Sequence, residues 1–281
     1  MFFFRPQYLI VEFVMNFIYR LLVAIIAIPF LIWLIIQGNL YLLVLLLVLT
    51  LTGTYEMTKM IRINNKNLSK FILIPSAIVL VSSSLNKAEL SLFAVILTFI
   101  LFTFFDIVKG RLQFSLSRAS TLLLVIFYPG VLFSYIYRLR HDFSVNGDYF
   151  GISITLSVIV LIWISDSFAY FVGMTLGKHR GLLKSSPKKS LEGFFGGLVT
   201  PFIAVMIYYY FSKDIALRYL LFSAMAAGIF GQIGDLIESI LKRDCGIKDS
   251  SNLIPGHGGI LDRFDSILIA IPILYYCVRF F

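Results

Sequence analysis

Long runs of hydrophobic residues alternate with short polar breaks along almost the whole of this 281-residue chain. Nine of these runs approach the roughly 17 to 25 residues that a helix needs to cross a bilayer. We therefore predict an all-α, polytopic integral membrane protein with nine transmembrane helices, at Phe17–Ile36, Leu40–Thr58, Phe71–Leu85, Leu90–Phe105, Thr121–Tyr137, Tyr149–Leu176, Phe194–Phe211, Tyr219–Ile237 and Ile267–Phe281. The third and the last run are shorter than the others, which leaves a partly interfacial position open for both.

Aromatic and aliphatic side chains dominate the composition so strongly that a soluble domain is excluded. Hydrophobic residues make up 59% of the chain, 28 residues are phenylalanine and only 14% are charged. The mean hydropathy is +0.91, and so little polar surface cannot cover a core of ordinary size. The net charge of +9 would suggest a nucleic-acid ligand in a soluble protein, but in a membrane protein the distribution of Lys and Arg between loops matters more. We predict no nucleic-acid partner.

The basic residues fall unevenly between the two sides of the predicted bundle. If the N-terminus lies in the cytoplasm, eighteen of the 24 Lys and Arg residues are inside and six are outside. The opposite orientation reverses this ratio. Because basic residues accumulate in cytoplasmic loops, we predict a cytoplasmic N-terminus and a C-terminus outside.

The chain divides into two regions according to where its polar residues lie. The first five predicted helices, within residues 1–148, have no ionisable residues in their centres, and we assign this region to a scaffold. Residues 149–281 hold the last four helices and two long polar loops, Gly177–Gly193 and Glu238–Ser266. Both loops are cytoplasmic in the predicted topology, so we expect the chemistry of the protein there.

The sixth predicted helix carries an acid and two glycines on one face. Asp166, Tyr170, Gly173 and Gly177 recur at spacings of three to four residues, and the glycines allow another helix to approach closely. An acid in a membrane helix is costly and usually marks a functional cavity. A polar pin between two helices is the alternative for Asp166.

The eighth predicted helix repeats this design. Gly228, Gly231, Asp235 and Glu238 lie on one stripe, and Lys242 continues it one turn further. Close packing beside acids again suggests a polar pocket. A simple ion pair between Glu238 and Lys242 within the helix is the alternative.

The loop that follows contains the stretch PGHGGILDRFDS, in which two carboxylates face the same way if they lie on a helix. Asp262 and Asp265 are three residues apart. Together with Asp235, and with Glu238 as a further candidate, they would repel one another strongly unless a cation lay among them. Ligands that are all oxygen suit Mg²⁺, so we predict a magnesium site.

The glycines of this stretch permit a tight backbone turn with exposed N–H groups. Gly258 and Gly259 are therefore candidates for an anion-binding nest. His257 has no Cys or His partner at the spacing of a zinc site, so we interpret it as a hydrogen-bonding residue of the loop or a phosphate contact.

The other cytoplasmic loop supplies positive charge through the stretch SPKKSLEG. Lys188 and Lys189 follow a proline and precede Ser190, which has the pattern of a helix start. Lysines at a helix N-terminus suit a polyphosphate, whereas attraction to lipid headgroups, about 1 kcal/mol per basic residue, is the alternative. Acids for Mg²⁺, bases for phosphates and glycines for close backbone approach together indicate phosphoryl or nucleotidyl transfer at a membrane surface.

The stretch from Ser239 to Asp265 resembles the signature of the phosphatidate cytidylyltransferases, which are also called CDP-diacylglycerol synthases. The matching positions are Ser239, Lys242, Arg243, Lys248, Asp249, Pro255, His257, Gly258, Gly259, Asp262, Arg263 and Asp265, without a departure. The stretches SDSFAYFVG and SPKKSLEG are also similar to that family, so the resemblance is dense over Trp163–Ser266 and general before it.

The resemblance implies the reaction of CTP with phosphatidate to give CDP-diacylglycerol and pyrophosphate in phospholipid biosynthesis. It also implies Mg²⁺ as cofactor, leaves a role for K⁺ open, and implies a homodimer. By position it suggests metal binding for Asp235, Asp262 and Asp265, and nucleotide or phosphate contact for Lys188, Lys189, Lys242, Arg243, Lys248 and His257. From this and from the residue patterns, we predict catalysis for Asp235, Asp262, Asp265 and Lys242, Glu238 as a further metal ligand, and substrate binding also for Asp166, Gly258, Gly259 and Arg263. The charge distribution between the loops puts this site at the cytoplasmic face, and we expect the plasma membrane as its location.

Other reactions and other classes of protein use similar residues. A CTP-dependent lipid kinase would bind the same lipid and nucleotide, but the lipid would attack the γ-phosphorus instead of the α-phosphorus. A CDP-alcohol phosphatidyltransferase is disfavoured because its Asp-Gly-x-x-Ala-Arg motif is absent. An ion-coupled transporter would use Asp166 and Asp235 as a cation relay, but transporter sites lie near the membrane midplane, whereas these acids gather at one face.

Overall fold

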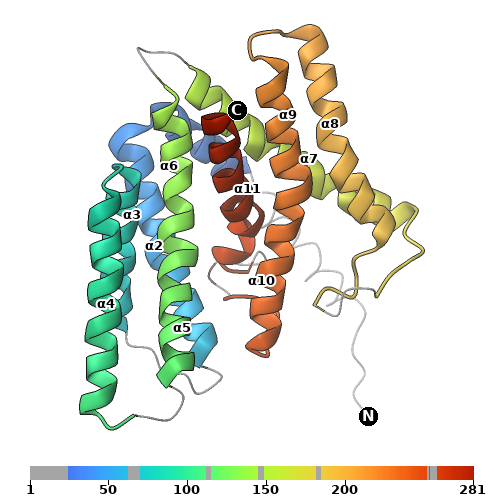
Figure 1. The fold of residues 1–281 in the computed structure, drawn as a ribbon. Helices are drawn as coiled ribbons and strands as arrows, with labels where there is room; N and C mark the ends of the chain where they lie inside the picture. The colour runs from blue at the N-terminus through green and yellow to red at the C-terminus, as the bar shows by residue number, and fades with distance from the viewer. Residues whose placement is uncertain are drawn as a thin grey trace, which may run out of the picture.

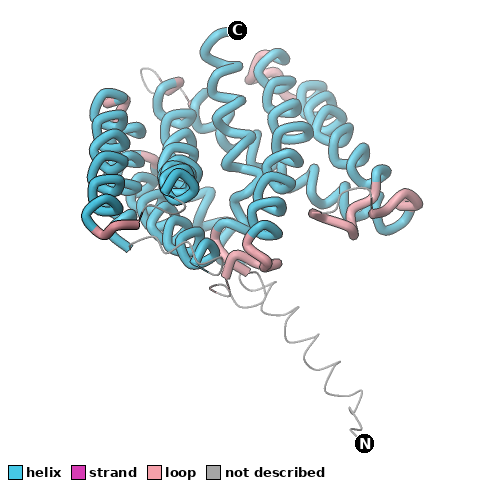
Figure 2. Tube along the Cα trace, turned by 60° about the horizontal axis from the view of Figure 1, so that its bottom comes forward, coloured by secondary structure: helices cyan, strands magenta, loops and turns pink. Residues whose placement is uncertain are grey.

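The computed structural model describes residues 25–62, 70–111, 115–144, 149–181, 185–251, 253 and 258–281. Within these ranges the chain has no β-strand, and its helices are joined by short loops (Figure 2). The first described helix is Ile25–Gln37. The elements that follow are α2 (Asn39–Arg62), η1 (Lys70–Ile72), α3 (Leu73–Ser84), α4 (Ala88–Val108), α5 (Ser115–Ile126), η2 (Phe127–Val131), α6 (Leu132–Asp142), α7 (Phe150–Thr175), α8 (Leu191–Phe211), α9 (Leu217–Met225), η3 (Ala226–Gly231), α10 (Gln232–Asp244) and α11 (Leu261–Phe280).

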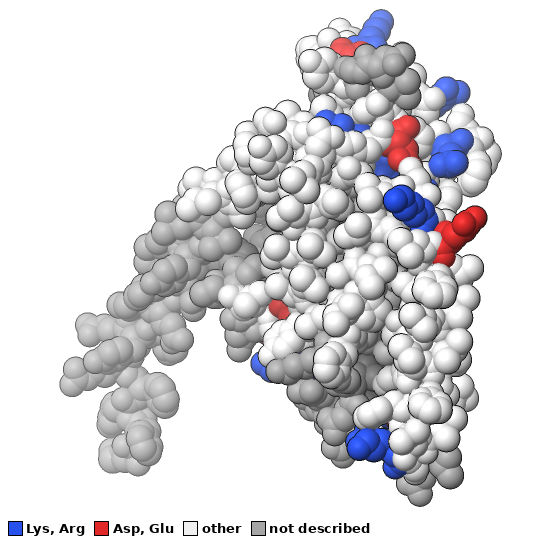
Figure 3. Space-filling view, turned by 90° about the vertical axis from the view of Figure 1, so that its left-hand side faces the viewer, with Lys and Arg blue, Asp and Glu red and all other residues white. Residues whose placement is uncertain are grey.

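Six helices in the described part of the chain are long and apolar enough to cross a membrane. They are Asn39–Ile61, Ala88–Val108, Ser115–Asp142, Phe150–Thr175, Leu191–Phe211 and Leu217–Asp244. Figure 3 shows one face of the molecule on which basic and acidic groups gather in the upper part and basic groups near the lower end, with mostly uncharged surface between them, as expected of a surface in lipid. The all-helical fold is therefore confirmed, whereas the count of nine crossings and the direction of the termini stay predictions.

Each of the nine predicted runs coincides with a helix, although residues 17–24 of the first run lie outside the described residues. Three helices in these positions are not among the six. Helix Ile25–Gln37 and α3 are apolar but short, and α11 carries charged residues in its first and last turns. α11 also begins at Leu261, six residues ahead of the predicted run, because the hydrogen bonds of a helix do not depend on apolar side chains. Asp262 and Asp265 therefore lie on a helix.

Two of the long spans are interrupted by a π-helical turn. η2 joins α5 to α6 and contains Pro129, which has no N–H to donate and so disturbs the regular helix. η3 joins α9 to α10 and contains Gly228, where an added Cβ would lie 2.7 Å from the backbone oxygen of Leu198. The glycine thus allows the η3 turn to touch the backbone of α8.

The C-terminal helix α11 lies at the centre of the bundle (Figure 1). It packs against α6, α7, α9, η3 and α10, and Leu268, Ile271 and Tyr275 on it are fully buried. Its C-terminal end lies at the upper side of Figure 1, so its first turn lies toward the opposite side, where α10 ends. The fold therefore brings the charged start of α11 to the charged end of α10.

Helices α7 and α8 pack closely through small residues. An added Cβ at Gly193 would lie 2.6 Å from the backbone oxygen of Ala169 and 3.0 Å from the Cα of Gly173. Ser165 Oγ also donates a hydrogen bond of 2.8 Å to the carbonyl of Gly197. The predicted close approach of another helix to Gly173 is confirmed, and the approaching helix is α8.

Candidate active site

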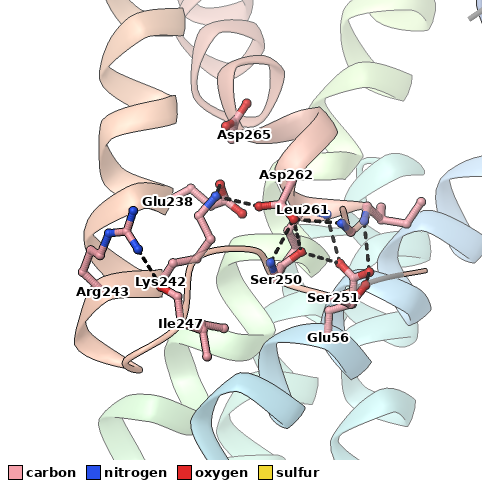
Figure 4. Close-up of polar contacts among 12 residues, drawn as sticks. Glu56, Glu238, Lys242, Arg243, Ile247, Ser250, Ser251, Leu261, Asp262 and Asp265 are labelled. Atoms are coloured by element: carbon pink, nitrogen blue, oxygen red, sulfur yellow. Dashed lines mark hydrogen bonds and ion pairs between the residues drawn. The ribbon is translucent and has the colours of Figure 1, made fainter. Parts of the chain in front are cut away.

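Lys242, near the end of α10, is the centre of a buried group of charges (Figure 4). Its Nζ donates to Glu238 Oε2 at 2.5 Å and to Asp262 Oδ1 at 2.6 Å. Only 1% of Glu238 and 9% of Lys242 are exposed. The ion pair within α10 is therefore present, but it has a third member from α11. A buried ammonium shared by two carboxylates is stable only while all three partners remain.

The second carboxylate oxygen of Asp262 is bound by the loop that precedes α11. Asp262 Oδ2 accepts hydrogen bonds from Ser250 N at 2.9 Å, Ser250 Oγ at 2.8 Å and Gly259 N at 2.8 Å. Burial opposes the ionisation of Asp262, but the hydrogen bonds from Lys242, Gly259 and Ser250 outweigh it and hold its pKa below the ordinary value. Asp262 is thus a fixed carboxylate.

The two glycines of the motif are required by this close packing. Gly258 has a φ of +84°, and an added Cβ would lie 2.7 Å from Asp262 Oδ2. A Cβ at Gly259 would collide with Ser250 Oγ and lie 2.7 Å from the carboxylate oxygens of Glu56. The N–H of Gly259 binds the carboxylate of Asp262 in this structure, and its contact with phosphate stays a prediction.

Glu56 of α2 also belongs to this group, and the sequence analysis missed it. Only 2% of this residue is exposed. Its Oε1 accepts from Ser251 Oγ at 2.5 Å and Ile260 N at 3.0 Å, and its Oε2 accepts from Ser250 Oγ at 3.2 Å and Leu261 N at 3.1 Å. The signal was a carboxylate near the end of an apolar helix, which is costly unless it has a role. Glu56 thus connects α2 to the motif loop, and the division of the chain at residue 148 stays a prediction.

A second group of charges lies where the basic loop meets α10. Lys189 forms an ion pair with Asp235, and the side chains are 41% and 27% exposed. Desolvation lowers the pKa of Lys189, against the attraction of Asp265 and Asp166. Ser190 caps α8 by accepting a hydrogen bond of 3.1 Å from Gly193 N, so the predicted helix start is confirmed.

Asp166 and Asp265 lie close to this second group. Asp166 is exposed on α7 and interacts electrostatically with Asp265, Lys189 and Arg263. Asp265 accepts a hydrogen bond of 2.6 Å from Ser266 N. Figure 4 shows it one turn beyond Asp262 on α11. Asp166 is therefore near the acids of the motif, and its role in substrate binding stays a prediction.

Arg243 is the one of the remaining predicted contact residues whose side-chain hydrogen bonds are described. Arg243 Nε donates to the carbonyl of Ser185 at 3.2 Å, and its guanidinium also donates to the carbonyl of Ile247 at 3.2 Å. Arg243 thus ties the end of α10 to both polar loops. Lys188 and Lys248 are exposed. His257 lies outside the described residues, so its role stays a prediction.

The predicted metal ligands are near one another but are not assembled into a metal site. No three His, Cys, Asp or Glu side chains of the described residues are placed to hold a metal ion. Asp235 is paired with Lys189 and Asp262 with Lys242. Their chemistry nevertheless suits a hard cation, because Glu238 Oε1 is buried without a hydrogen-bond partner and oxygen ligands are those that Mg²⁺ prefers. The magnesium site stays a prediction.

Tyr128 of η2 is a second residue that the sequence analysis missed. It is 3% exposed, and its hydroxyl is buried without a hydrogen-bond partner. It lies in the π-turn η2 of the span Ser115–Asp142. An aromatic residue in an apolar run gave no signal that its hydroxyl would be buried without a partner.

Comparison with known proteins identifies the family of this chain. The model of the cytidylyltransferase family matches residues 18–281. The chain belongs to this family. It is 35% identical over 272 residues to a phosphatidate cytidylyltransferase of Bacillus subtilis, which covers 93% of this chain and 97% of the relative. It is also 35% identical over 268 residues to a phosphatidate cytidylyltransferase of Staphylococcus saprophyticus, which covers 91% of this chain and 96% of the relative. The similarity thus extends over both halves, including the α2 region that carries Glu56.

Proposed function

We propose that this chain transfers the cytidylyl group of CTP to phosphatidate and so forms CDP-diacylglycerol and pyrophosphate in phospholipid biosynthesis. The observation that carries the proposal is the arrangement of Glu238, Lys242 and Asp262 at the end of α10 and the start of α11. These residues lie in or next to the signature stretch, and a phosphatidate cytidylyltransferase is similar over 93% of this chain. Six helices suited to a membrane agree with a lipid substrate.

The chemistry needs positioned charges and no strong general base. A phosphomonoester has a second pKa of about 6, so phosphatidate is already ionised near neutral pH. Its oxygen attacks the α-phosphorus of CTP, the bond from that phosphorus to the bridging oxygen breaks, and pyrophosphate leaves with the electron pair. Lys189 and the exposed Lys188 neutralise the departing phosphates.

The acids supply the other half of the site. Asp235, Asp262 and Asp265, together with the unpartnered oxygen of Glu238, would hold Mg²⁺, and that ion when bound would neutralise charge at the α-phosphate. Asp262 is already bound by Lys242 and the loop. In this proposal Lys242 positions Asp262, because its own donors are directed to carboxylates. A role for K⁺ and assembly into a homodimer are further expectations from the family resemblance.

The proposed orientation in the membrane depends on which helix ends carry the basic loops. We propose nine crossings with the N-terminus in the cytoplasm, because the polar loops with most of the basic residues then lie inside. The C-terminus lies on the side opposite the end of α10 in Figure 1, in agreement with a C-terminus outside. The site then lies at the cytoplasmic face, and we propose the plasma membrane as its location.

Differently labelled CTP separates cytidylyl transfer from lipid phosphorylation. The purified protein in detergent is given phosphatidate, Mg²⁺ and CTP labelled at either the α- or the γ-phosphate. We expect the α label to enter the lipid and the γ label to leave as pyrophosphate, with no pyrophosphate released when phosphatidate is omitted. Recovery of the γ label in lipid would replace this assignment with a lipid kinase.

A further inference from the structure

Glu56 connects the N-terminal half of the chain to the motif loop. It lies in the last two turns of α2, and its two oxygens are within hydrogen-bond distance of four donors, on Ser250, Ser251, Ile260 and Leu261 (Figure 4). The single proton of the Ser250 hydroxyl is shared between Glu56 and Asp262. The donors lie about two hundred residues further along the chain. All four of these donors are neutral groups, so the carboxylate is stabilised by hydrogen bonding rather than by an ion pair.

Glu56 provides the hydrogen-bond acceptor that the first N–H groups of α11 do not find within their own helix. The N-cap position of this helix, Ile260, has no side chain that could accept a hydrogen bond from the first turn, and the first N–H groups of any helix have no partner within it. Glu56 accepts from the N–H groups of Ile260 and Leu261. Its negative charge also suits the positive end of the helix dipole. A residue of α2 therefore fixes where α11 begins.

The same carboxylate acts on Asp262 through Ser250 and Gly259. Ser250 Oγ lies within hydrogen-bond distance of both acids, 3.2 Å from Glu56 Oε2 and 2.8 Å from Asp262 Oδ2. Gly259 lies so close to both Ser250 and Glu56 that a Cβ would not fit between them. Ser250 and Gly259 provide three of the four donors to Asp262. Any movement of Glu56 is therefore transmitted to the orientation of Asp262.

We propose that Glu56 is a positioning residue for the transfer reaction. It holds the motif loop and the first turn of α11 so that Asp262 keeps its orientation toward Lys242 and the rest of the site. The inference rests on the proposed cytidylyl transfer, and it adds a residue from outside the signature stretch. Misplacement of a catalytic group by about 1 Å costs on the order of 100-fold in rate, so the loss of this support should act on turnover.

The test compares two variants of Glu56 with a matched control in purified full-length protein. Glu56→Gln keeps the size of the side chain, but an amide has one acceptor oxygen and cannot serve four donors. Glu56→Asp keeps the charge on a shorter side chain and should recover part of the activity. We expect kcat of Glu56→Gln to fall about 10- to 100-fold, with KM for CTP changed less than about 3-fold. Glu89→Gln, an exposed glutamate at the start of α4, should behave as the wild type.

Hydrogen exchange gives a readout that does not depend on activity. In Glu56→Gln the amides of residues 258–262 should exchange faster, while amides in the buried part of α11 keep their protection.

Normal kcat per folded molecule combined with a lower unfolding temperature would overturn the proposal and leave Glu56 a purely structural role. If Glu56→Gln does not fold, Ser251→Ala removes one donor with the charge kept, and unchanged kcat in both Ser251→Ala and Glu56→Asp would overturn it as well. A wild type without cytidylyl transfer refutes the proposed function, whereas unchanged exchange refutes the anchoring by Glu56.

Discussion

Asp262 and Asp265 lie one turn apart on α11, yet their surroundings differ. Asp262 accepts hydrogen bonds from Lys242, Ser250 and Gly259, whereas the contact described for Asp265 is the N–H of Ser266. The charge of Asp262 is thus part of a buried ion network, and the charge of Asp265 is balanced by more distant groups. We therefore expect removal of the Asp262 charge to lower both stability and turnover, and removal of the Asp265 charge to lower mainly turnover.

We predict that Asp262→Asn and Asp265→Asn both reduce pyrophosphate release by about 100-fold or more, because each removes charge from the transfer site. Asp262→Asn should also lower the free energy of unfolding by about 2 to 3 kcal/mol, since it breaks a buried ion pair and leaves Lys242 with one carboxylate. Asp265→Asn should cost less than about 1 kcal/mol. Thermal unfolding in detergent and the release assay measure both effects.

The control is Glu89→Gln, an exposed acid at the start of α4 in the N-terminal half of the chain, which should change neither quantity. Wild-type turnover in both α11 variants would assign the two acids to structural roles only.

At the scale of the element, the π-turn η3 decides how α8, α10 and α11 meet. It packs against α7, α8 and α11 and is followed directly by α10, which carries Asp235, Glu238 and Lys242. Its two glycines, Gly228 within the turn and Gly231 at its end, are not equivalent. A Cβ at Gly228 would lie 2.7 Å from the backbone oxygen of Leu198, whereas the nearest atom to a Cβ at Gly231 is 3.6 Å away.

We therefore predict that Gly228→Ala destabilises the protein by about 1 to 3 kcal/mol, because backbone atoms of α8 must move to make room. Gly231→Ala should be neutral or slightly stabilising, since alanine costs less conformational entropy than glycine within a helix. Thermal unfolding of the two variants side by side in detergent tests this. Equal destabilisation by both substitutions would contradict the predicted contact between η3 and α8.

At the scale of the whole molecule, the charged groups separate into two ends joined by an apolar body. The site lies where α10 ends and α11 begins, and a different cluster lies toward the C-terminal end of α11. There Arg138 donates a hydrogen bond of 2.7 Å to the hydroxyl of Tyr275, which itself donates to Asp142 at 2.7 Å. This second cluster ties α6 to α11 and fixes the central helix at the end away from the site.

The proposed topology predicts which exposed positions an impermeant thiol reagent can reach. Cys245 is a poor reporter because it is buried, so single cysteines are introduced after Cys245 and Cys277 are replaced. Lys213→Cys should be labelled from outside intact cells, whereas Lys248→Cys should be labelled only after the cells are made permeable. Labelling of Lys248→Cys in intact cells would reverse the orientation.

Features that depend on neighbours along the chain could be predicted without the fold. Within the described residues each apolar run falls on a helix, the spacing of four residues offered an ion pair between Glu238 and Lys242 as an alternative, and Ser190 was predicted to cap α8. These features follow from the length of a membrane helix and from the geometry of a single helix turn. The signature stretch between Ser239 and Asp265 likewise identified the family without any knowledge of the fold.

Only the tertiary structure decided which helices meet. Helices that are apolar on most sides can bury any face, so their periodicity does not say which neighbour each one has. Nothing local indicated that Lys242 binds Asp262, that Lys189 pairs with Asp235, or that Glu56 supports a loop about two hundred residues away. These contacts exist because α11 lies at the centre of the bundle, where its first turn meets the ends of α2 and α10. A buried charge in surroundings of low polarity is costly unless it is paired or hydrogen-bonded.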